Sequence, residues 1–214
     1  MVIIMKKAYM FAAAAVMAAL AYLLWQNNDI EVTRYFYTSN KIGGGLDGFK
    51  IVHLSDLHGK SFGRRNHRLL TNIEREQPDI IVISGDICDE WHGSEGIDTA
   101  IELVAQASRI APVYYAAGNH EYALSSKDRK RLFLGISDAG GVILENDRVE
   151  LDIKGEKLYI CGMADRGASL AALESMLDKT SDGLALLIAH RPQYAESYAF
   201  AGADLSFCGH AHGG

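Results

Sequence analysis

Five short apolar segments of this chain each end at polar residues of the kinds that bind metal ions. In the first, the apolar run 50–55 (KIVHLS) leads into Asp56, Leu57 and His58. Such a run is typical of a buried strand. Side chains two residues apart in an extended backbone project to the same side, so Asp56 and His58 could reach one ion. A carboxylate and an imidazole together suit a divalent metal.

The other four segments repeat this pattern along the chain. Their apolar runs and the polar residues that follow are 79–84 with Asp86, 112–116 with Asn119 and His120, 184–189 with His190, and 203–208 with His210 and His212. In α/β sheets, sites assemble in the loops beyond the carboxyl ends of strands. One strand that ends in a polar turn indicates little. Five of them predict that these side chains gather at one edge of a sheet.

Helix and turn patterns fill the intervals between these segments. Apolar residues recur at helical spacing in three ranges, which are 64–76, 98–108 and 170–177. Residues 142–163 contain three strand-like runs, which we expect to form a meander. Residues 30–37 alternate loosely and predict a first strand, which a glycine-rich connection follows.

The N-terminal segment differs in kind from the rest. Residues 8–25 form an uncharged apolar run near the length of a helix that spans a bilayer. Lys6 and Lys7 precede the run and acids follow it, which predicts a single span with the remaining chain outside the cytoplasm. A cytoplasmic domain is the alternative orientation. Cleavage as a signal segment, near Ala19-Leu20-Ala21, and a buried alanine-rich core helix are two further interpretations.

The composition excludes some classes of protein. With 49% hydrophobic and 22% charged residues among 214, the chain has the make-up of a globular protein. Its net charge of −6, without a basic block, gives no indication of a nucleic-acid partner. The three cysteines, Cys88, Cys161 and Cys208, lie far apart, which argues against a disulfide framework or a zinc finger.

Taken together, the polar segments resemble the motifs of the calcineurin-like metallophosphoesterase superfamily, in particular its membrane-associated phosphodiesterase branch. In order, the motifs are DxH at 56–58, GDxxD at 85–89, GNHE at 118–121, the lone His190, and GHxHGG at 209–214. Several motifs in one consistent structural context are rarely accidental. The resemblance implies a four-layer α/β (α+β) fold, in which a two-layer β-sandwich is flanked by helices.

The resemblance also implies roles for the polar residues. Two divalent transition metals, Mn, Fe or Zn, would be bound. The ligands implied are Asp56, His58 and His212 for the first metal, Asn119, His190 and His210 for the second, and Asp86 as the bridge. A hydroxide shared by the two metals would attack the phosphorus while the metals clamp the phosphate oxygens.

A second set of residues is implied for the leaving group. His120 would be the general acid, and Asp89 matches the family carboxylate that orients this imidazole. Glu121 is the rival candidate for the orienting role. Arg64 and Arg65 could touch a substrate phosphate, although a basic helix start is more often plain surface.

We expect three parts in the chain. These are a membrane anchor or signal segment (1–28), the first strand with its glycine-rich connection (29–47), and the metallophosphoesterase domain (48–214). Members of the superfamily normally continue past GHxHGG, so the domain is expected to be incomplete at its C-terminus. His210 and His212 would then lie on an end that frays.

The expected function is hydrolysis of a phosphodiester by a metal-bridging hydroxide, with the phosphoester substrate at the membrane surface and possibly lipid-linked. A pyrophosphate such as UDP-diacylglucosamine, in glycolipid metabolism, is the alternative substrate, although the predicted orientation disfavours it. The alternative of another class is a non-catalytic scaffold. A scaffold would have no need of Asp86 or His120.

Overall fold

The computed structural model describes residues 2–26, 28–166, 169–178 and 180–212, and the chain divides into one unit that ends at Phe36 and one from Tyr37 onward. The first unit contains α1 (Val2–Gln26), whose side chains at 2–9, 11 and 24 are outside the description. Among the described residues, no helix combines the length and the apolar character needed to cross a bilayer. The predicted membrane-spanning helix stays a prediction.

The predicted first strand over 30–37 is wrong, because these residues have no regular secondary structure. Tyr35 and Phe36 are 89% and 93% exposed, so the loose alternation of this segment packs against no neighbouring strand. A strand needs a hydrogen-bonded partner. An alternating sequence whose apolar side chains stay exposed gains nothing from pairing.

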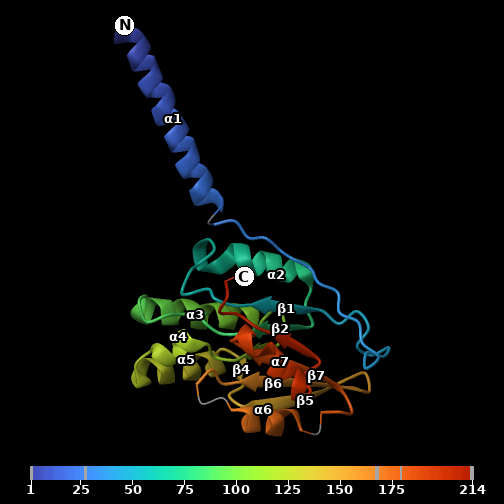
Figure 1. The fold of residues 1–214 in the computed structure, drawn as a ribbon. Helices are drawn as coiled ribbons and strands as arrows, with labels where there is room; N and C mark the ends of the chain where they lie inside the picture. The colour runs from blue at the N-terminus through green and yellow to red at the C-terminus, as the bar shows by residue number, and fades with distance from the viewer. Residues whose placement is uncertain (1, 27, 167–168, 179, 213–214) are drawn as a thin grey trace. The chain divides into compact units, whose positions relative to one another are not determined.

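The second unit contains two four-stranded sheets (Figure 1). The first sheet is parallel throughout, in the order β1 (Ile51–Leu54), β2 (Ile80–Ile83), β3 (Val113–Tyr115) and β4 (Gly141–Ile143). The second has the order β5 (Asp147–Ile153), β6 (Glu156–Met163), β7 (Leu184–Ala189) and β8 (Leu205–Phe207). Here β5 and β6 form an antiparallel hairpin, and β7 and β8 continue in parallel.

The expected meander over 142–163 is therefore wrong in its topology. The three strand-like runs exist, but β4 pairs with β3 in the first sheet, whereas β5 and β6 begin the second sheet. Gly141 explains why β4 lies where it does. A Cβ there would lie 2.7 Å from a methyl of Ile136 and 2.9 Å from one of Val104, so the strand packs closely under two helices.

Alternate residues of the central strands divide the core into layers. Ile80 and Val82 of β2 and Ile160 of β6 belong to one cluster between the sheets, whereas Cys161 of β6 and Leu187 of β7 belong to another. The second cluster includes α6 residues, so it lies on the outer face of the second sheet. Strands buried on both faces are typical of parallel sheets covered by helices. The predicted two-layer sandwich flanked by helices is confirmed.

Helices cover the outer faces of the sheets (Figure 1). The longer ones are α2 (His67–Glu76), α3 (Gly93–Ala107) and α5 (Ser126–Asp138), and the shorter ones are α4 (Asn119–Ala123), α6 (Leu170–Leu177) and α7 (Ala195–Phe200). Single 3-10 turns occupy Arg64–Asn66 and Pro192–Tyr194. Ser125 and Ser169 cap α5 and α6, because each hydroxyl accepts a backbone N–H at 3.1 Å.

Candidate metal centre

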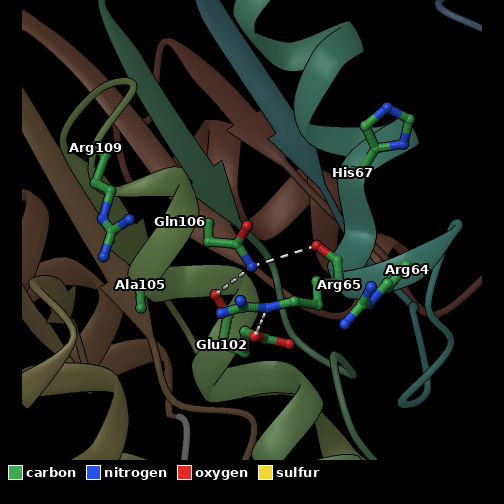
Figure 2. Close-up of a pocket in the computed structure, with 7 residues that line it drawn as sticks. All are labelled: Arg64, Arg65, His67, Glu102, Ala105, Gln106 and Arg109. Carbon is green, nitrogen blue, oxygen red and sulfur yellow. Dashed lines mark hydrogen bonds and ion pairs between the residues drawn. The ribbon is translucent and has the colours of Figure 1, made fainter.

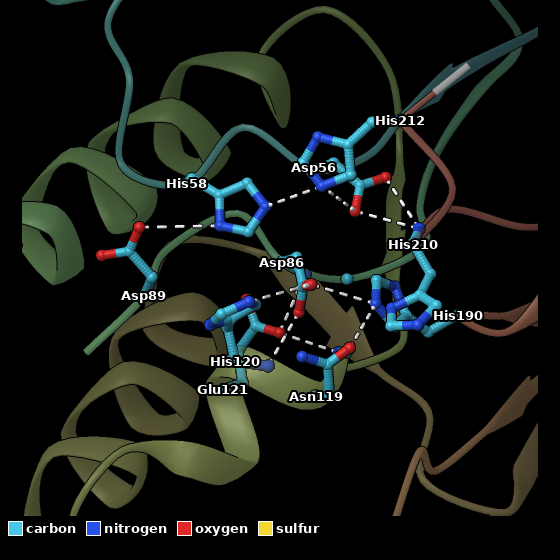
Figure 3. A network of polar contacts seen from close by, with 12 residues as sticks. Asp56, His58, Asp86, Asp89, Asn119, His120, Glu121, His190, His210 and His212 are labelled. Atoms are coloured by element: carbon cyan, nitrogen blue, oxygen red, sulfur yellow. Dashed lines mark hydrogen bonds and ion pairs between the residues drawn. The ribbon is translucent and has the colours of Figure 1, made fainter. Parts of the chain in front are cut away.

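The predicted metal ligands come together beyond the carboxyl ends of five strands (Figure 3). Asp56 and His58 follow β1 and Asp86 follows β2. Asn119 and His120 begin α4 after β3, His190 follows β7, and His210 and His212 follow β8. Because the strands that carry these loops are parallel within each sheet, the loops lie at one edge of that sheet. The two sheets pack face to face, so these two edges lie together.

One group of ligands joins the loops after β1 and β8. Asp56, His58 and His212 each offer one ligand atom, and these atoms lie within 4.8 Å of one another. Nε2 of His58 is 3.2 Å from Nε2 of His212, which is 3.6 Å from Oδ1 of Asp56. The carboxylate of Asp56 also accepts the backbone N–H of His210 at 2.9 and 3.0 Å, which fixes the β8 loop against β1.

The second group is more deeply buried. Asp86, His190 and His210 offer ligand atoms within 4.8 Å, and Asp86 and His190 are each 1% exposed. Nε2 of His190 lies 3.0 Å from Oδ2 of Asp86 and 3.1 Å from Oδ1 of Asn119. Burial raises the pKa of Asp86, but hydrogen bonds from His190 and from the backbone of His120 outweigh it, so the pKa is lowered.

The donor set fits a metal ion. Nδ1 of His190 lies 2.8 Å from the carbonyl oxygen of Ser84, which can only accept, so this nitrogen carries a proton. Burial lowers the pKa of His190, but the hydrogen bond between Nε2 and Oδ2 of Asp86 outweighs it, so the pKa is raised and Nε2 holds a second proton. A metal ion can take the place of that proton, and imidazole with carboxylate and amide oxygen suits Mn, Fe or Zn.

Five of the seven predicted ligands have a left-handed backbone. The φ angles of Asp56, His58, Asp86, His210 and His212 lie between 48° and 67°. Non-glycine residues rarely adopt this conformation, which costs roughly 1–3 kcal/mol each and concentrates at functional sites. These turns reverse the chain at the strand ends, so consecutive ligands point back toward the same space.

Two glycines hold the β2 and β3 loops in contact. Gly85 has a φ of 97°, and a Cβ there would overlap the backbone nitrogen of Gly118. A Cβ at Gly118 would in turn overlap Oδ1 of Asp86 and lie 2.8 Å from Nδ1 of His190. Only residues without a side chain allow the two main chains to approach this closely.

Glu121 ties these loops together instead of orienting His120. Its buried carboxylate accepts the backbone N–H groups of Gly118 at 2.7 Å, Ile87 at 2.8 Å and Asp86 at 2.9 Å. Burial, and then the charge of Asp86, raise the pKa of Glu121 to about 7, against the effect of these hydrogen bonds. The role of Glu121 is thus to shape the GDxxD loop, and the sequence did not indicate this.

The carboxylate partner of His120 is Glu90, which the sequence reasoning missed. Nδ1 of His120 lies 2.9 Å from Oε2 of Glu90. Asp89, expected in this place, instead has its two oxygens 2.7 Å from Nδ1 of His92 and 3.6 Å from Nδ1 of His58. Because Asp89 closes the turn that follows Asp86, its side chain is directed away from His120. The one feature of the sequence that could have pointed to Glu90 is that it is an acid directly after Asp89.

A hollow of about 520 Å³ opens beside the first ligand group. Asp56 and His212 line it together with His53, Ser55, Pro192, Cys208, Gly209 and Ala211. Nε2 of His53, at the rim, lies 2.7 Å from the hydroxyl oxygen of Ser84. Of the predicted ligands, Asp56 and His212 are the two that line this space.

Arg64 and Arg65, in the 3-10 turn before α2, line a different hollow, of about 320 Å³ (Figure 2). Arg65 pairs with Glu102 of α3, and Gln106 donates to the carbonyl oxygen of Arg65 at 3.3 Å. None of the predicted metal ligands lines this hollow. The suggestion that Arg64 and Arg65 touch a substrate phosphate at the metal centre therefore gains no support.

A family model described as calcineurin-like phosphoesterase matches residues 49–214. The chain belongs to this family. The match begins two residues before β1 and includes all five strand-end motifs, so the resemblance seen in the sequence is confirmed. Members of the family generally bind a dimetal centre, and the residues gathered here could form a metal site.

Three relatives are similar over most of this chain. An uncharacterized metallophosphoesterase of Bacillus subtilis (strain 168), YkoQ, is 26% identical, covering 77% of this chain and 61% of that protein. A transmembrane protein with metallophosphoesterase domain from Bos taurus is 28% identical, covering 82% and 43%. The phosphodiesterase YaeI of Escherichia coli (strain K12) is 25% identical, covering 78% and 61%. The chain thus spans less than two thirds of the length of these relatives.

A solved structure supports the fold. The phosphopantetheinyl hydrolase PptH from Mycobacterium tuberculosis superposes with a TM-score of 0.52 at 15% sequence identity, covering 76% of this chain and 83% of that one. At this identity the similarity concerns the fold alone.

Proposed function

We propose that this protein is a metal-dependent phosphodiesterase. The observation that carries the proposal is the position of Asp86 between the two ligand groups. Its buried carboxylate belongs to one group with His190 and His210 and to another with His58 and His120. A single carboxylate shared in this way is what a bridge between two metals requires.

The chain's own residues would divide the work as follows. Asp56, His58 and His212 would hold one metal, Asn119, His190 and His210 would hold the other, and Asp86 would be shared by both. Two bound metals would lower the pKa of water and offset the charge that builds on phosphate oxygens. The carbonyl of Ser84 fixes the ring of His190, so this ligand needs no rearrangement when a metal enters.

His120 is the proposed general acid for the departing oxygen. Its ring lies 4.8 Å from that of His58, centroid to centroid, so it faces the metal ligands without being needed as one of them. Its backbone N–H donates to Oδ1 of Asp86 at 2.9 Å, which fixes the residue beside the bridge. Glu90 holds Nδ1, so Nε2, which lies 4.0 Å from Oδ2 of Asp86, is the nitrogen that would give its proton to the substrate.

A phosphodiester is the substrate we favour over other phosphoesters. The support comes from the similarity to YaeI, which is named a phosphodiesterase. Nothing in the site favours the alternative, a pyrophosphate of the UDP-diacylglucosamine type. The scaffold alternative gains nothing either, because all seven predicted ligands are brought together with their ligand atoms facing one another.

The expected substrate at a membrane surface, possibly lipid-linked, stays a prediction. It is supported by the apolar composition of residues 8–25 and by the name of the Bos taurus relative. Against it stands the finding that the described residues include no helix able to span a bilayer. Sedimentation of the expressed protein with membranes, and its release by detergent but not by alkaline carbonate, would support the prediction.

The proposed function is tested with a chromogenic phosphodiester, bis(p-nitrophenyl) phosphate, with Mn²⁺, Fe²⁺ or Zn²⁺ added. We expect turnover that depends on added metal. Asp86→Asn should abolish both this turnover and the binding of a second metal equivalent. The matched control is Asp98→Asn, the same chemical change at a surface position on α3. Turnover that survives Asp86→Asn, or no turnover with any of the three metals, contradicts the proposal.

A further inference from the structure

Trp91 lies beside the proposed general acid but is mostly exposed to solvent. Its ring centroid is 5.0 Å from that of His120, with 57° between the ring planes, and the residue is 73% exposed. Among the exposed large hydrophobic residues that the structure describes, it is the one in ring contact with a predicted site residue. So exposed an indole adds little to the core, and most of its surface is open to a ligand.

The backbone that presents this indole is held firmly. Oδ1 of Asp89 accepts the backbone N–H of Trp91 at 3.1 Å and that of His92 at 2.9 Å. The same oxygen lies 2.7 Å from the ring nitrogen of His92. The turn that carries Trp91 is therefore continuous with the GDxxD loop, and a backbone held in this way loses less entropy when a ligand binds.

We propose that Trp91 is a platform on which a planar aromatic ring of the leaving group stacks, which makes aryl-bearing or nucleobase-bearing phosphodiesters the preferred substrates. The inference rests on the proposed function, because His120 marks the side from which the leaving group departs. A general acid must lie within hydrogen-bond reach of the departing oxygen. The atoms beyond that oxygen then lie over the surface next to His120, where the indole is.

The surroundings of Trp91 favour a planar ring over a flexible acyl chain. An acyl chain needs a contiguous apolar surface. The side chains in sequence and in ring contact with Trp91 are instead polar, namely Asp89, Glu90, His92 and His120. A planar ring can cover one indole face and leave these groups in water. Stacking on an aromatic side chain changes affinity by roughly five- to a hundredfold for each ring.

The kinetic test uses two phosphodiesters of equal bulk, methyl benzyl phosphate and methyl cyclohexylmethyl phosphate, whose leaving alcohols differ mainly in planarity. We expect Trp91→Ala to lower kcat/KM for the benzyl ester roughly five- to a hundredfold, chiefly through KM, and to leave the cyclohexylmethyl ester nearly unchanged. Trp91→Phe should keep most of the preference. Leu134→Ala, at an exposed apolar position on α5, is the matched control.

Two results of this test would overturn the platform. Equal losses for both esters would mean that the indole offers plain apolar contact or positions His120. No loss for either ester would mean that the leaving group does not reach the indole.

A binding measurement separates this inference from the proposed function. The chain has two tryptophans, so Trp25→Phe leaves Trp91 as the sole indole fluorophore. We expect adenosine 5′-monophosphate to quench its fluorescence at several-fold lower concentration than ribose 5-phosphate, which lacks the base. Equal titrations would overturn stacking. Because this readout needs no turnover, it decides the inference even if Asp86→Asn retains activity and the proposed function fails.

Discussion

Nδ1 of His120 lies 2.9 Å from Oε2 of Glu90, the acid directly after the aspartate that the family motif points to. Burial lowers the pKa of His120, but the hydrogen bond with Glu90 and the charges of Asp86 and Glu90 outweigh it, so the pKa is raised. A proton is therefore held on this ring to a higher pH than on an ordinary histidine, as a general acid requires.

Glu90→Gln should move the alkaline limb of the pH–rate profile to lower pH. The acid form of His120 is the active one, and loss of the carboxylate lowers its pKa, so activity is lost earlier as the pH rises. The measurement is kcat/KM of a phosphodiester from pH 5 to 10. Glu95→Gln, in the first turn of α3, is the control. An alkaline limb that does not move would exclude Glu90 from this role.

His120→Ala should slow hydrolysis without removing the metals. General acid catalysis contributes about 10²–10⁴-fold, and a leaving group that departs readily as an anion needs it least. The loss should thus be large for an alkyl ester and small for a p-nitrophenyl ester. Metal content and both rates are measured on the same preparation. Equal slowing of the two esters would mean that His120 does not donate the proton.

Asp89→Asn should weaken metal binding at the His58 group. Oδ2 of Asp89 lies 3.6 Å from Nδ1 of His58, and loss of such a supporting carboxylate typically costs 10–100-fold in metal affinity. Titration calorimetry with Zn²⁺ or Mn²⁺ measures the effect. Glu90→Gln, the same change one residue later, should leave the affinity unaltered. Equal affinities of Asp89→Asn and the native protein would contradict the prediction.

Glu121→Gln should destabilise the fold in the absence of metal. An amide presents one acceptor oxygen where the carboxylate presents two, so at least one of the backbone N–H groups of Asp86, Ile87 and Gly118 loses its partner. An unsatisfied buried donor costs about 1–3 kcal/mol. Urea unfolding with a chelator present measures the free energy of unfolding, and Glu174→Gln, at an exposed position on α6, is the control. If Glu121→Gln lowers the free energy of unfolding no more than Glu174→Gln does, the carboxylate is not needed for stability.

The sequence predicted the parts of the fold that depend on local pattern. Runs such as 184–189 and 170–177 agree with β7 and α6 residue for residue, because continuous burial and helical periodicity are written in neighbouring residues. The pairing of β4 with β3 was not predicted, because it depends on the packing of Gly141 under distant residues. Helix α5, which no pattern had indicated, is held by its Ser125 cap and by burial of Leu132 and Ile136.

For the site, too, the sequence predicted the features that depend on neighbouring residues and missed those that depend on tertiary contacts. Residue types at strand ends were enough to predict which side chains the structure brings together. The sequence did not predict which carboxylate pairs with which histidine. Asp89 and Glu90 are neighbours with the same charge, but their side chains contact different histidines, His92 and His120. The left-handed backbone at His58 and His212 is equally invisible in sequence, because nothing but tertiary contact holds a histidine there.

The contact between Gly85 and Gly118 means that the main chain alone sets the distance between Asp86 and Asn119. A side chain at either glycine would push the two loops apart, and a smaller residue at the other glycine could not compensate, because that position already lacks a side chain. The opening that a metal ion would fill between these two residues is therefore fixed by two backbones in contact and not by the size of any side chain.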